Sequence, residues 1–396
     1  MKKIFFITGE SSGDIHAGSL LTELYKMIPK EQLIVKAVGG NKLEEAGAEI
    51  FFNCKDLGSM GVTEVISKLS LYLNLEKEII LQLSTFLPHV LILVDFPGFN
   101  LRILKKVKEK FPEIKTVYYL PPQVWAWKEG RTKTLSKYCD LVLCGLPFEE
   151  EFHRKRGVNA YYVGNPIINE LENYDREIIR SELEVSKDKK LIGIFPGSRK
   201  SEIDYMLPVL LKAANDLAKD FTNVMFFVSQ AYTISNLDKT MNDLINKNNL
   251  QNIKSNIKIL PPGNNHKLLC ASDILWLTSG TVTLEAALYG NPLILGYKGN
   301  NINYLIYLLL RKTKLIGLPN IIAESEIVPE LKQYKATPKN FYEITESWLN
   351  NPNKMTEVKS NLQILRGKLT ERNASQEAAL KIKDKFLPDY KVVTLK

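Results

Sequence analysis

Short apolar segments alternate with amphipathic segments along almost the whole chain. The apolar segments are rich in Val, Ile and Leu, and the segments between them have the apolar spacing of helices. This alternation predicts parallel strands that are joined by helices, as in α/β proteins. The expected strands are residues 4–7, 33–38, 90–94, 116–120 and 141–144, followed by residues 191–195, 224–228, 257–260, 274–277 and 292–296.

A charged segment divides these strands into two series. Residues 170–190 carry many charged side chains and no strand pattern, so we place a linker near residues 165–173. A chain of 396 residues also exceeds one ordinary hydrophobic core. We therefore predict two doubly wound, Rossmann-like domains with an interdomain cleft, in which ligands meet the carboxyl ends of the strands. The expected parts are residues 1–168, residues 169–345, and helices in residues 346–396 that pack back on the first domain.

The composition, with 45% hydrophobic and 24% charged residues, is that of a globular protein. No apolar run reaches the roughly 18 residues that a membrane-spanning helix needs. The apolar residues 4–7 are too few for a signal peptide. The four cysteines show no C-x-x-C spacing, which argues against a zinc site or a disulfide framework and favours a cytoplasmic protein.

The net charge is +9, and nearly all of it lies in the later part of the chain. Residues 1–150 carry 19 Lys and Arg against 18 Asp and Glu. A basic excess after residue 150 favours anionic partners, such as phosphates, nucleic acid or an acidic membrane surface. A solvated basic surface without a partner would give the same count.

Two strand-to-helix turns in the second domain have the residues of an anion site. Gly197, Ser198 and Arg199 follow strand 191–195, and the start of the next helix offers backbone N–H groups beside a fixed cation. The alternative is an ordinary β–α turn in which Arg199 caps a neighbouring loop. This turn alone does not decide between the two, and the anion site is favoured because a second turn of the same kind lies in the same domain.

The second of these turns follows strand 274–277. Ser279, Gly280 and Thr281 would form a donor-rich helix entrance with room for a diphosphate, and Glu285 is placed to reach ribose hydroxyls. The alternative is a common Ser/Thr-Gly helix start in which Glu285 completes a cap. No G-x-G fingerprint, P-loop or D-x-D pair is present. We therefore predict a nucleotide-sugar site that uses neither a metal nor a cofactor.

The first domain brings carboxylates to the carboxyl ends of its strands. Glu10, Ser12 and Asp14 lie in the turn after strand 4–7, and Asp95 ends strand 90–94 just before Pro97 and Gly98. An acidic side chain at that edge is suited to accept a proton from a substrate hydroxyl. Capping of the next helix is the alternative role for Asp95, although Asn100 is better placed for it.

Aromatic residues gather a little later in the first domain. Trp125 and Trp127 lie beside prolines, and Arg131 follows closely. Aromatic faces at a cleft suit sugar or acyl packing, although a buried aromatic corner would have the same composition. The histidines are scattered singly, and His16 alone lies in a motif.

Two further stretches are too apolar for an ordinary amphipathic helix. The first contains Met60, Val62, Val65, Ile66 and Leu69. The second is residues 302–310, which basic residues flank with no acid between residues 298 and 314. Apolar surface with a basic rim is typical of proteins that bind anionic lipid, whereas a buried core helix is the alternative.

These motifs together resemble the lipid-A-disaccharide synthase family. The resemblance rests on GESSGD (9–14), DFPGFN (95–100), YYLPPQVWAW (118–127), PFEEEF (147–152), FPGSRKSE (195–202), SGTVTLEAAL (279–288), LPN (318–320) and RNASQEAA (372–379). It implies an inverting glycosyltransferase of the GT-B fold. That enzyme would join UDP-2,3-diacylglucosamine to 2,3-diacylglucosamine 1-phosphate (lipid X) and release UDP and lipid A disaccharide 1-phosphate.

The resemblance also implies roles for the candidate residues. Asp95 would be the catalytic base, with Glu10 or Asp14 as the alternative. The UDP site would comprise Gly197, Ser198, Arg199, Ser279, Gly280, Thr281 and Glu285, and the acceptor and acyl site Ser12, Asn100, Trp125, Trp127 and Arg131. The apolar stretches would place a cytoplasmic protein peripherally on the anionic inner membrane of a Gram-negative bacterium. Nucleic acid is not an expected partner, and a homodimer is left open.

Two positions depart from the family pattern. Asn165 stands where the family usually has a histidine, and Pro121 stands where it commonly has a serine.

Three other functions remain open from the residues themselves. These are another GT-B enzyme, such as the N-acetylglucosaminyltransferase of peptidoglycan lipid intermediates, a UDP-sugar epimerase, and a non-enzymatic nucleotide-sugar or lipid-binding module.

Overall fold

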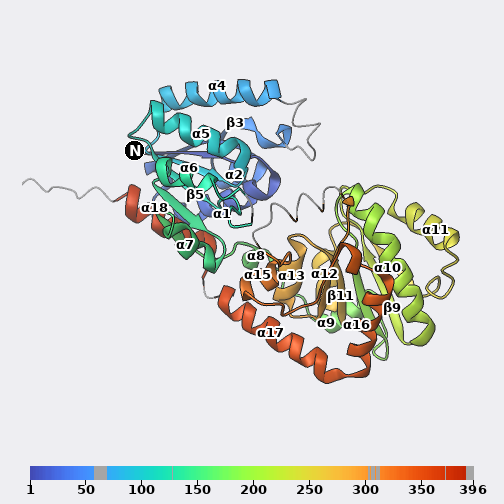
Figure 1. Ribbon diagram of the computed structural model, residues 1–396. Coiled ribbons are helices and arrows are strands. Elements are labelled where there is room, and N and C mark those ends of the chain that lie inside the picture. The colour runs from blue at the N-terminus through green and yellow to red at the C-terminus, as the bar shows by residue number, and fades with distance from the viewer. Residues whose placement is uncertain are drawn as a thin grey trace, which may run out of the picture. The chain divides into compact units, whose positions relative to one another are not determined.

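The computed structural model describes residues 1–57, 69–126, 128–301, 304, 308, 313–370 and 372–388. The chain forms two compact units. Unit 1 comprises Met1–Pro166 together with Leu369–Lys396, and unit 2 comprises Ile167–Lys368. Each unit is built on one parallel sheet that helices cover on both faces (Figure 1).

The sheet of unit 1 has seven strands in the order β3-β2-β1-β4-β5-β6-β7. The strand order reverses beside β1, where Ile4 pairs with Val35 on one side and with Val90 on the other. The strands are β1 (Lys2–Ile7), β2 (Leu33–Gly39), β3 (Glu49–Asn53), β4 (Val90–Val94), β5 (Lys115–Tyr119), β6 (Leu141–Cys144) and β7 (Ala160–Tyr162). The helices are α1 (Ser11–Met27), α2 (Asn41–Ala46), α4 (Leu69–Phe86), α5 (Pro97–Lys110), α6 (Arg131–Tyr138), α7 (Pro147–Arg154) and α18 (Ala374–Phe386).

Alternate residues of β1 enter two separate cores. Ile4 and Phe6 are fully buried with α1 and α18, whereas Phe5 and Ile7 are fully buried with α4 and α5. Successive side chains of a strand point to opposite faces, so a strand covered on both sides needs an unbroken apolar run. This is why residues 4–7 are apolar without alternation.

The sheet of unit 2 has six strands in the order β10-β9-β8-β11-β12-β13. The strands are β8 (Lys190–Phe195), β9 (Val224–Ser229), β10 (Ile257–Leu260), β11 (Ile274–Thr278), β12 (Leu293–Tyr297) and β13 (Glu330–Lys332). The helices described are α8 (Ile167–Glu170), α9 (Arg176–Glu182), α10 (Lys200–Asp220), α11 (Leu237–Lys247), α12 (Asn265–Ala271), α13 (Val282–Tyr289), α15 (Leu318–Ala323), α16 (Pro338–Asn350) and α17 (Pro352–Thr370).

The last part of the chain divides between the two units at a different position from the one expected. The sequence placed the change at residue 346, but the residues up to Lys368 cluster with unit 2 and only those from Leu369 onward with unit 1. Phe341 and Trp348 of α16 are buried in the core beneath α10. In α18, Ala378 packs into the core that α1 covers, and the two helices lie side by side (Figure 1).

Candidate active site

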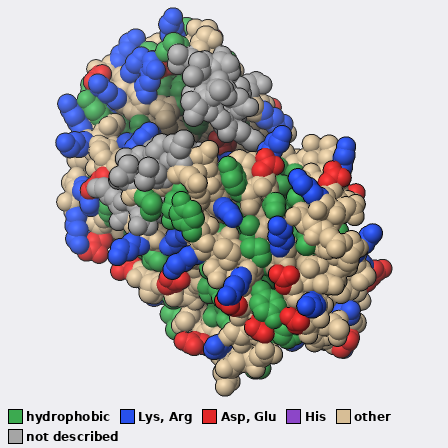
Figure 2. Space-filling view, turned by 45° about the vertical axis from the view of Figure 1, so that its right-hand side comes forward, with side chains coloured by type: hydrophobic (Ala, Val, Ile, Leu, Met, Phe, Trp, Pro, Cys, Tyr) green, Lys and Arg blue, Asp and Glu red, His purple; other side chains and the backbone are tan. Residues whose placement is uncertain are grey.

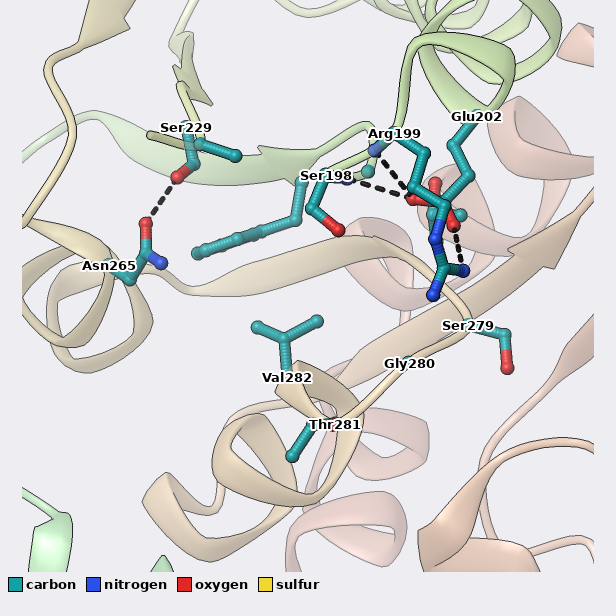
Figure 3. A pocket seen from close by; sticks show the side chains of 13 residues that line it. Ser198, Arg199, Glu202, Ser229, Asn265, Ser279, Gly280, Thr281 and Val282 are labelled. Atoms are coloured by element: carbon teal, nitrogen blue, oxygen red, sulfur yellow. Dashed lines mark hydrogen bonds and ion pairs between the residues drawn. The ribbon is translucent and has the colours of Figure 1, made fainter. Parts of the chain in front are cut away.

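A pocket of about 260 Å³ lies in unit 2 at the carboxyl ends of β9, β8 and β11, which are neighbours in the sheet. The strand order of this sheet reverses between β8 and β11, and doubly wound sheets bind ligands at the position of such a reversal. Both turns that the sequence selected for an anion line this pocket (Figure 3). The lining residues are Phe195, Gly197, Ser198, Arg199, Glu202, Ser229, Ala231, Asn265, Thr278, Ser279, Gly280, Thr281 and Val282.

The turn between β8 and α10 closes around an acidic side chain of its own helix. Glu202 accepts hydrogen bonds from the backbone N–H groups of Ser198 (2.8 Å) and Arg199 (3.2 Å). Gly197 has a φ of +123°, and a Cβ atom there would lie 2.5 Å from Cβ of Glu202, so only glycine fits. The expectation that these two N–H groups bind an external anion is wrong for this conformation, because Glu202 already accepts from both.

Arg199 keeps an exposed guanidinium at the same turn. Its Nη1 lies 3.1 Å from Oε1 of Glu202, and 68% of its side chain is exposed against 20% for Glu202. Figure 3 shows the guanidinium directed from the turn toward the segment that carries Ser279 and Gly280. Arg199 therefore remains the cation that the sequence predicted for this pocket.

The turn between β11 and α13 is open. A Cβ atom on Gly280 would meet nothing within 4 Å, and Gly280 and Thr281 are exposed. The backbone N–H groups of Gly280, Thr281 and Val282 have no acceptor among the described residues, as expected for the first N–H groups of a helix. The hydroxyl of Ser279 donates to the carbonyl oxygen of Ile316 (3.3 Å). This turn can therefore bind an anion through its backbone.

Glu285 lies one turn into α13, outside the residues that line the pocket. Its Oε2 lies 3.6 Å from Nε2 of His266, and Nδ1 of His266 lies 4.0 Å from Glu172. The nearby Glu285 carboxylate raises the pKa of His266. Local sequence does not indicate this contact, because β11 separates the helices that carry His266 and Glu285.

Ser229 and Asn265 are pocket residues that sequence reasoning missed. The hydroxyl of Ser229 donates to Oδ1 of Asn265 at 2.6 Å (Figure 3). Ser229 ends β9 and Asn265 begins α12. The rule that ligands meet the carboxyl ends of parallel strands would have selected Ser229, whereas Asn265 begins the helix after β10.

In unit 1, the two acidic motifs pack directly against each other. A Cβ atom on Gly9 would lie 2.1 Å from the ring of Phe96, and one on Gly13 would lie 4.0 Å from Cβ of Asp95. Asp95 (φ 47°) and Phe96 (φ 50°) both adopt the left-handed conformation, which is strained for residues with a side chain. The structure therefore brings Gly9–Asp14 and Asp95–Asn100 together at the β1 and β4 ends.

Hydrogen bonds to its carbonyl oxygen hold Asp95 in this conformation. That oxygen accepts from the hydroxyl of Tyr118 (2.7 Å) and from Nδ2 of Asn100 (2.8 Å). Asn100 is fully buried and also reaches the carbonyl oxygen of Val94 (3.3 Å). The expectation that Asn100 contacts the acceptor is therefore wrong, because its amide is buried against the strand ends.

Burial raises the pKa of the Asp95 carboxyl, while a hydrogen bond from the Phe96 backbone and the nearby His16 oppose that rise. The side chain is half-buried. A carboxylate with a raised pKa is a stronger base than an ordinary one, and such shifts are typical of catalytic acids and bases. His16 lies close enough to Asp95 to affect its charge, which the sequence indicated only by the place of His16 in a motif.

Asp14 has a different role from the one considered for it. Its carboxylate, 4% exposed, accepts from the backbone N–H groups of Gly40 (2.7 Å), Lys42 (2.8 Å) and Leu43 (3.2 Å) at the start of α2. Asp14 is therefore unsuited as the alternative base, because its oxygens already cap a helix. Glu10 and Ser12 are both exposed at the start of α1.

Trp125 occupies the interior, which contradicts the expected sugar- or acyl-binding face. It is 8% exposed, and its Nε1 donates to Oε1 of Glu149 at 2.9 Å. Burial raises the pKa of Glu149 to about 7, although bonds from Trp125 and from the Leu146 backbone oppose the shift. Trp127 lies outside the described residues, and Arg131 begins α6 half-buried.

The predicted membrane-binding residues fall almost entirely outside the described parts of the chain. Met60, Val62, Val65 and Ile66 lie there, as do most of residues 302–310, while Leu69 begins α4. No described helix has the length and apolar character needed to cross a membrane. On the face drawn in Figure 2, Lys and Arg side chains are scattered among acidic and apolar ones. Within the described residues, no group of three or more His, Cys, Asp and Glu could hold a metal.

Comparisons with known sequences identify a family that this chain matches over nearly its whole length. The profile described as Lipid-A-disaccharide synthetase matches residues 4–383. The Lipid-A-disaccharide synthase of Sulfurihydrogenibium sp. (strain YO3AOP1) is 36% identical over 387 residues, which cover 96% of this chain and 97% of that protein. The protein of that name from Idiomarina loihiensis is 37% identical over 339 residues, covering 85% of this chain and 86% of its own.

Comparisons with solved structures concern the fold. UDP-GlcNAc 2-epimerase from Neisseria meningitidis, bound to UDP-GlcNAc, aligns with a TM-score of 0.61 at 12% identity over 98% of this chain and all of that one (100%). A glycosyltransferase from Rickettsia africae aligns with a TM-score of 0.57 at 13% identity over 97% of each chain. With the two parallel sheets, these neighbours confirm the predicted GT-B class of two doubly wound α/β domains.

Proposed function

Since the chain belongs to the lipid-A-disaccharide synthase family, we propose that it transfers 2,3-diacylglucosamine from UDP to the 6-hydroxyl of lipid X. The family makes it a hexosyltransferase of lipid A biosynthesis. The products of the proposed reaction are lipid A disaccharide 1-phosphate and UDP. The observation that carries the proposal is the pocket of unit 2, where the exposed guanidinium of Arg199 and the open N–H groups of α13 meet.

Unit 2 binds the UDP-sugar in this proposal. Its diphosphate accepts from the N–H groups of Gly280 and Thr281 and from the guanidinium of Arg199. Charge-assisted bonds of this kind are stronger than neutral ones and need no metal ion. Glu285, which His266 contacts, is the candidate for the ribose hydroxyls. As the sugar leaves, the same groups stabilise the negative charge that grows on UDP.

Unit 1 binds the acceptor and supplies the base. Asp95 removes the proton from the 6-hydroxyl while that oxygen attacks the anomeric carbon of the donor. The bond between oxygen and anomeric carbon forms as the bond between that carbon and the β-phosphate breaks, and UDP departs with the electron pair. A single displacement inverts the anomeric configuration. The raised pKa of Asp95 supports this role, because a base is most effective when its pKa approaches the working pH.

Both substrates of this reaction carry acyl chains, which requires access to a lipid surface. We therefore keep the proposal that the protein is cytoplasmic and binds the anionic inner membrane through the stretch that contains Val62, Ile66 and Leu69. The net charge of +9 supports attraction to anionic lipid and to the phosphate of lipid X.

The direct experiment incubates the purified protein with UDP-2,3-diacylglucosamine and lipid X and reads the products by mass spectrometry. The proposal predicts one disaccharide phosphate and one UDP for each donor consumed, and unchanged activity in EDTA. Conversion of a UDP-sugar into its epimer without disaccharide would instead identify an epimerase. Binding of UDP without turnover would identify a non-enzymatic module.

A further inference from the structure

The turn between β8 and α10 holds an internal anion at the place where the sequence predicted an external one. Oε2 of Glu202 accepts from the N–H groups of Ser198 and Arg199, and Oε1 pairs with Nη1 of Arg199 at 3.1 Å. All three contacts are those that a phosphate oxygen would make at a helix N-terminus beside an arginine. Glu202 also lines the nucleotide pocket.

The backbone part of this arrangement is fixed by the fold. Gly197 lies so close to Glu202 that a Cβ atom would be 2.6 Å from its Oε2. Glu202, the third residue of α10, accepts from the backbone N–H group of the N-cap residue Arg199 and from that of Ser198, so it satisfies N–H groups that would otherwise lack partners at the helix start. A nucleotide that displaced this carboxylate would have to replace every one of these bonds.

The ion pair between the side chains of Arg199 and Glu202 is not fixed by the fold in the way that the backbone contacts are. The Arg199 side chain is 68% exposed, and its other guanidinium N–H groups remain accessible on the side of the open α13 turn. Figure 3 shows the carboxylate of Glu202 above the guanidinium and Gly280 below it. A diphosphate on the α13 turn would therefore approach Arg199 from one side while Glu202 holds it from the other.

We propose that Glu202 competes with the nucleotide diphosphate for Arg199 and so keeps the affinity for UDP low enough for product release. The inference rests on the proposed function, because it requires UDP in this pocket. Glu202 is a positioning residue that acts through Arg199 and touches no reacting atom. Its carboxylate also repels the like charge of the diphosphate within a pocket of about 260 Å³.

The variant that separates this competition from a structural role is Glu202→Gln. The amide oxygen of glutamine can still accept from the N–H groups of the turn, so the cap is retained. The amide nitrogen cannot accept from Arg199, so the guanidinium loses its internal partner and the pocket loses one negative charge. UDP should then bind about 4- to 30-fold more tightly, with the lower value for a fully solvated pair.

Three further proteins serve as controls. Asp204→Asn removes the same charge from the first turns of the same helix at an exposed position outside the pocket, and should change the UDP affinity by less than about 2-fold. Glu202→Asp keeps the charge at the helix start and should stay within about 3-fold of the unaltered protein. In a protein that already carries Arg199→Ala, Glu202→Gln should change the logarithm of the UDP affinity by less than half as much as it does in the unaltered protein.

Calorimetry with UDP measures the affinities, thermal unfolding checks the fold, and UDP product inhibition gives a second readout. The inhibition constant for UDP should fall in the same proportion as the dissociation constant. The gain should shrink at about 1 M salt, where charges are screened within roughly 3 Å. If Glu202→Gln binds UDP no more tightly than the unaltered protein, or more weakly, the competition is refuted. If the unaltered protein does not bind UDP at all, the assignment of the pocket fails and the inference with it.

Discussion

Replacing Asp95 by Asn tests the catalytic assignment with little change in shape. Asn has the size and polarity of Asp, but it cannot accept the proton of the attacking hydroxyl. General base catalysis contributes roughly 10²–10⁴-fold to a rate, so kcat should fall by about that factor. The hydrogen bonds that hold this residue use its backbone carbonyl oxygen, which the substitution leaves in place. The affinity for UDP should not change, since the proposed nucleotide pocket lies in unit 2.

The raised pKa of Asp95 determines how the ionised carboxylate affects the stability of the folded state. Burial favours the protonated carboxyl in the folded state, so the aspartate destabilises the fold increasingly as the pH rises through its raised pKa. The Asn variant should therefore be at least as stable as the unaltered protein at pH 7, and this advantage should vanish in acid. In a plot of kcat/KM against pH, the apparent pKa of the acid limb should lie above the ordinary range of an aspartate. This limb should be absent from the Asn variant.

Asp14, in the first turn of α1, offers a matched control. Asp14→Asn removes a charge and one acceptor from the three N–H groups of α2, which should cost about 1–3 kcal/mol in urea unfolding. Turnover per folded molecule should stay within a few-fold of normal.

The reasoning would be refuted by a well-folded Asp95→Asn protein with nearly normal turnover, and the base would then be sought at Glu10.

Three other predictions address the nucleotide site and the interior. Arg199→Ala should weaken UDP binding by about 10- to 150-fold without loss of the fold, as calorimetry can measure, because it removes charge-assisted bonds of about 1.5–3 kcal/mol. Activity should survive EDTA, and a loss that added magnesium restores would contradict the metal-free site. The pKa of Glu149 is raised to about 7 from an ordinary 4.5, so this carboxyl should lower the free energy of unfolding by up to about 3 kcal/mol as the pH rises from 4.5 to 8, and in urea unfolding Glu149→Gln should lack this pH dependence.

All ten strands expected from the apolar pattern are present. Nine of them are central strands, which are buried on both faces and read as short apolar runs, and the tenth, β10, is an edge strand whose sequence is still largely apolar. The pattern missed β3, β7 and β13. Each of these strands lies at the edge of its sheet and is short, with one neighbour only, so its sequence need not be apolar throughout. Edge strands depend on pairing that the local sequence does not encode.

The turns of the candidate site could be found from local sequence, since Gly197 and Gly280 follow buried strands directly. The hydrogen-bond partners of other candidate side chains could not be found in this way. Asp14 is satisfied by N–H groups that follow it by 26 to 29 residues, and Trp125 is buried against Glu149 24 residues later. Contacts of this kind arise from tertiary packing, so a carboxylate that caps a distant helix and one that serves as a base look alike in the sequence.

The central claim is a single displacement that joins the two sugars with inversion. The most direct test uses UDP-diacylglucosamine labelled with ¹³C at the anomeric carbon, incubated with lipid X and followed by NMR. The account predicts one disaccharide whose labelled carbon is bonded to O6 of the acceptor, with the anomeric configuration opposite to that of the donor. A disaccharide that retains the donor configuration, or a labelled sugar that stays attached to UDP, would contradict it.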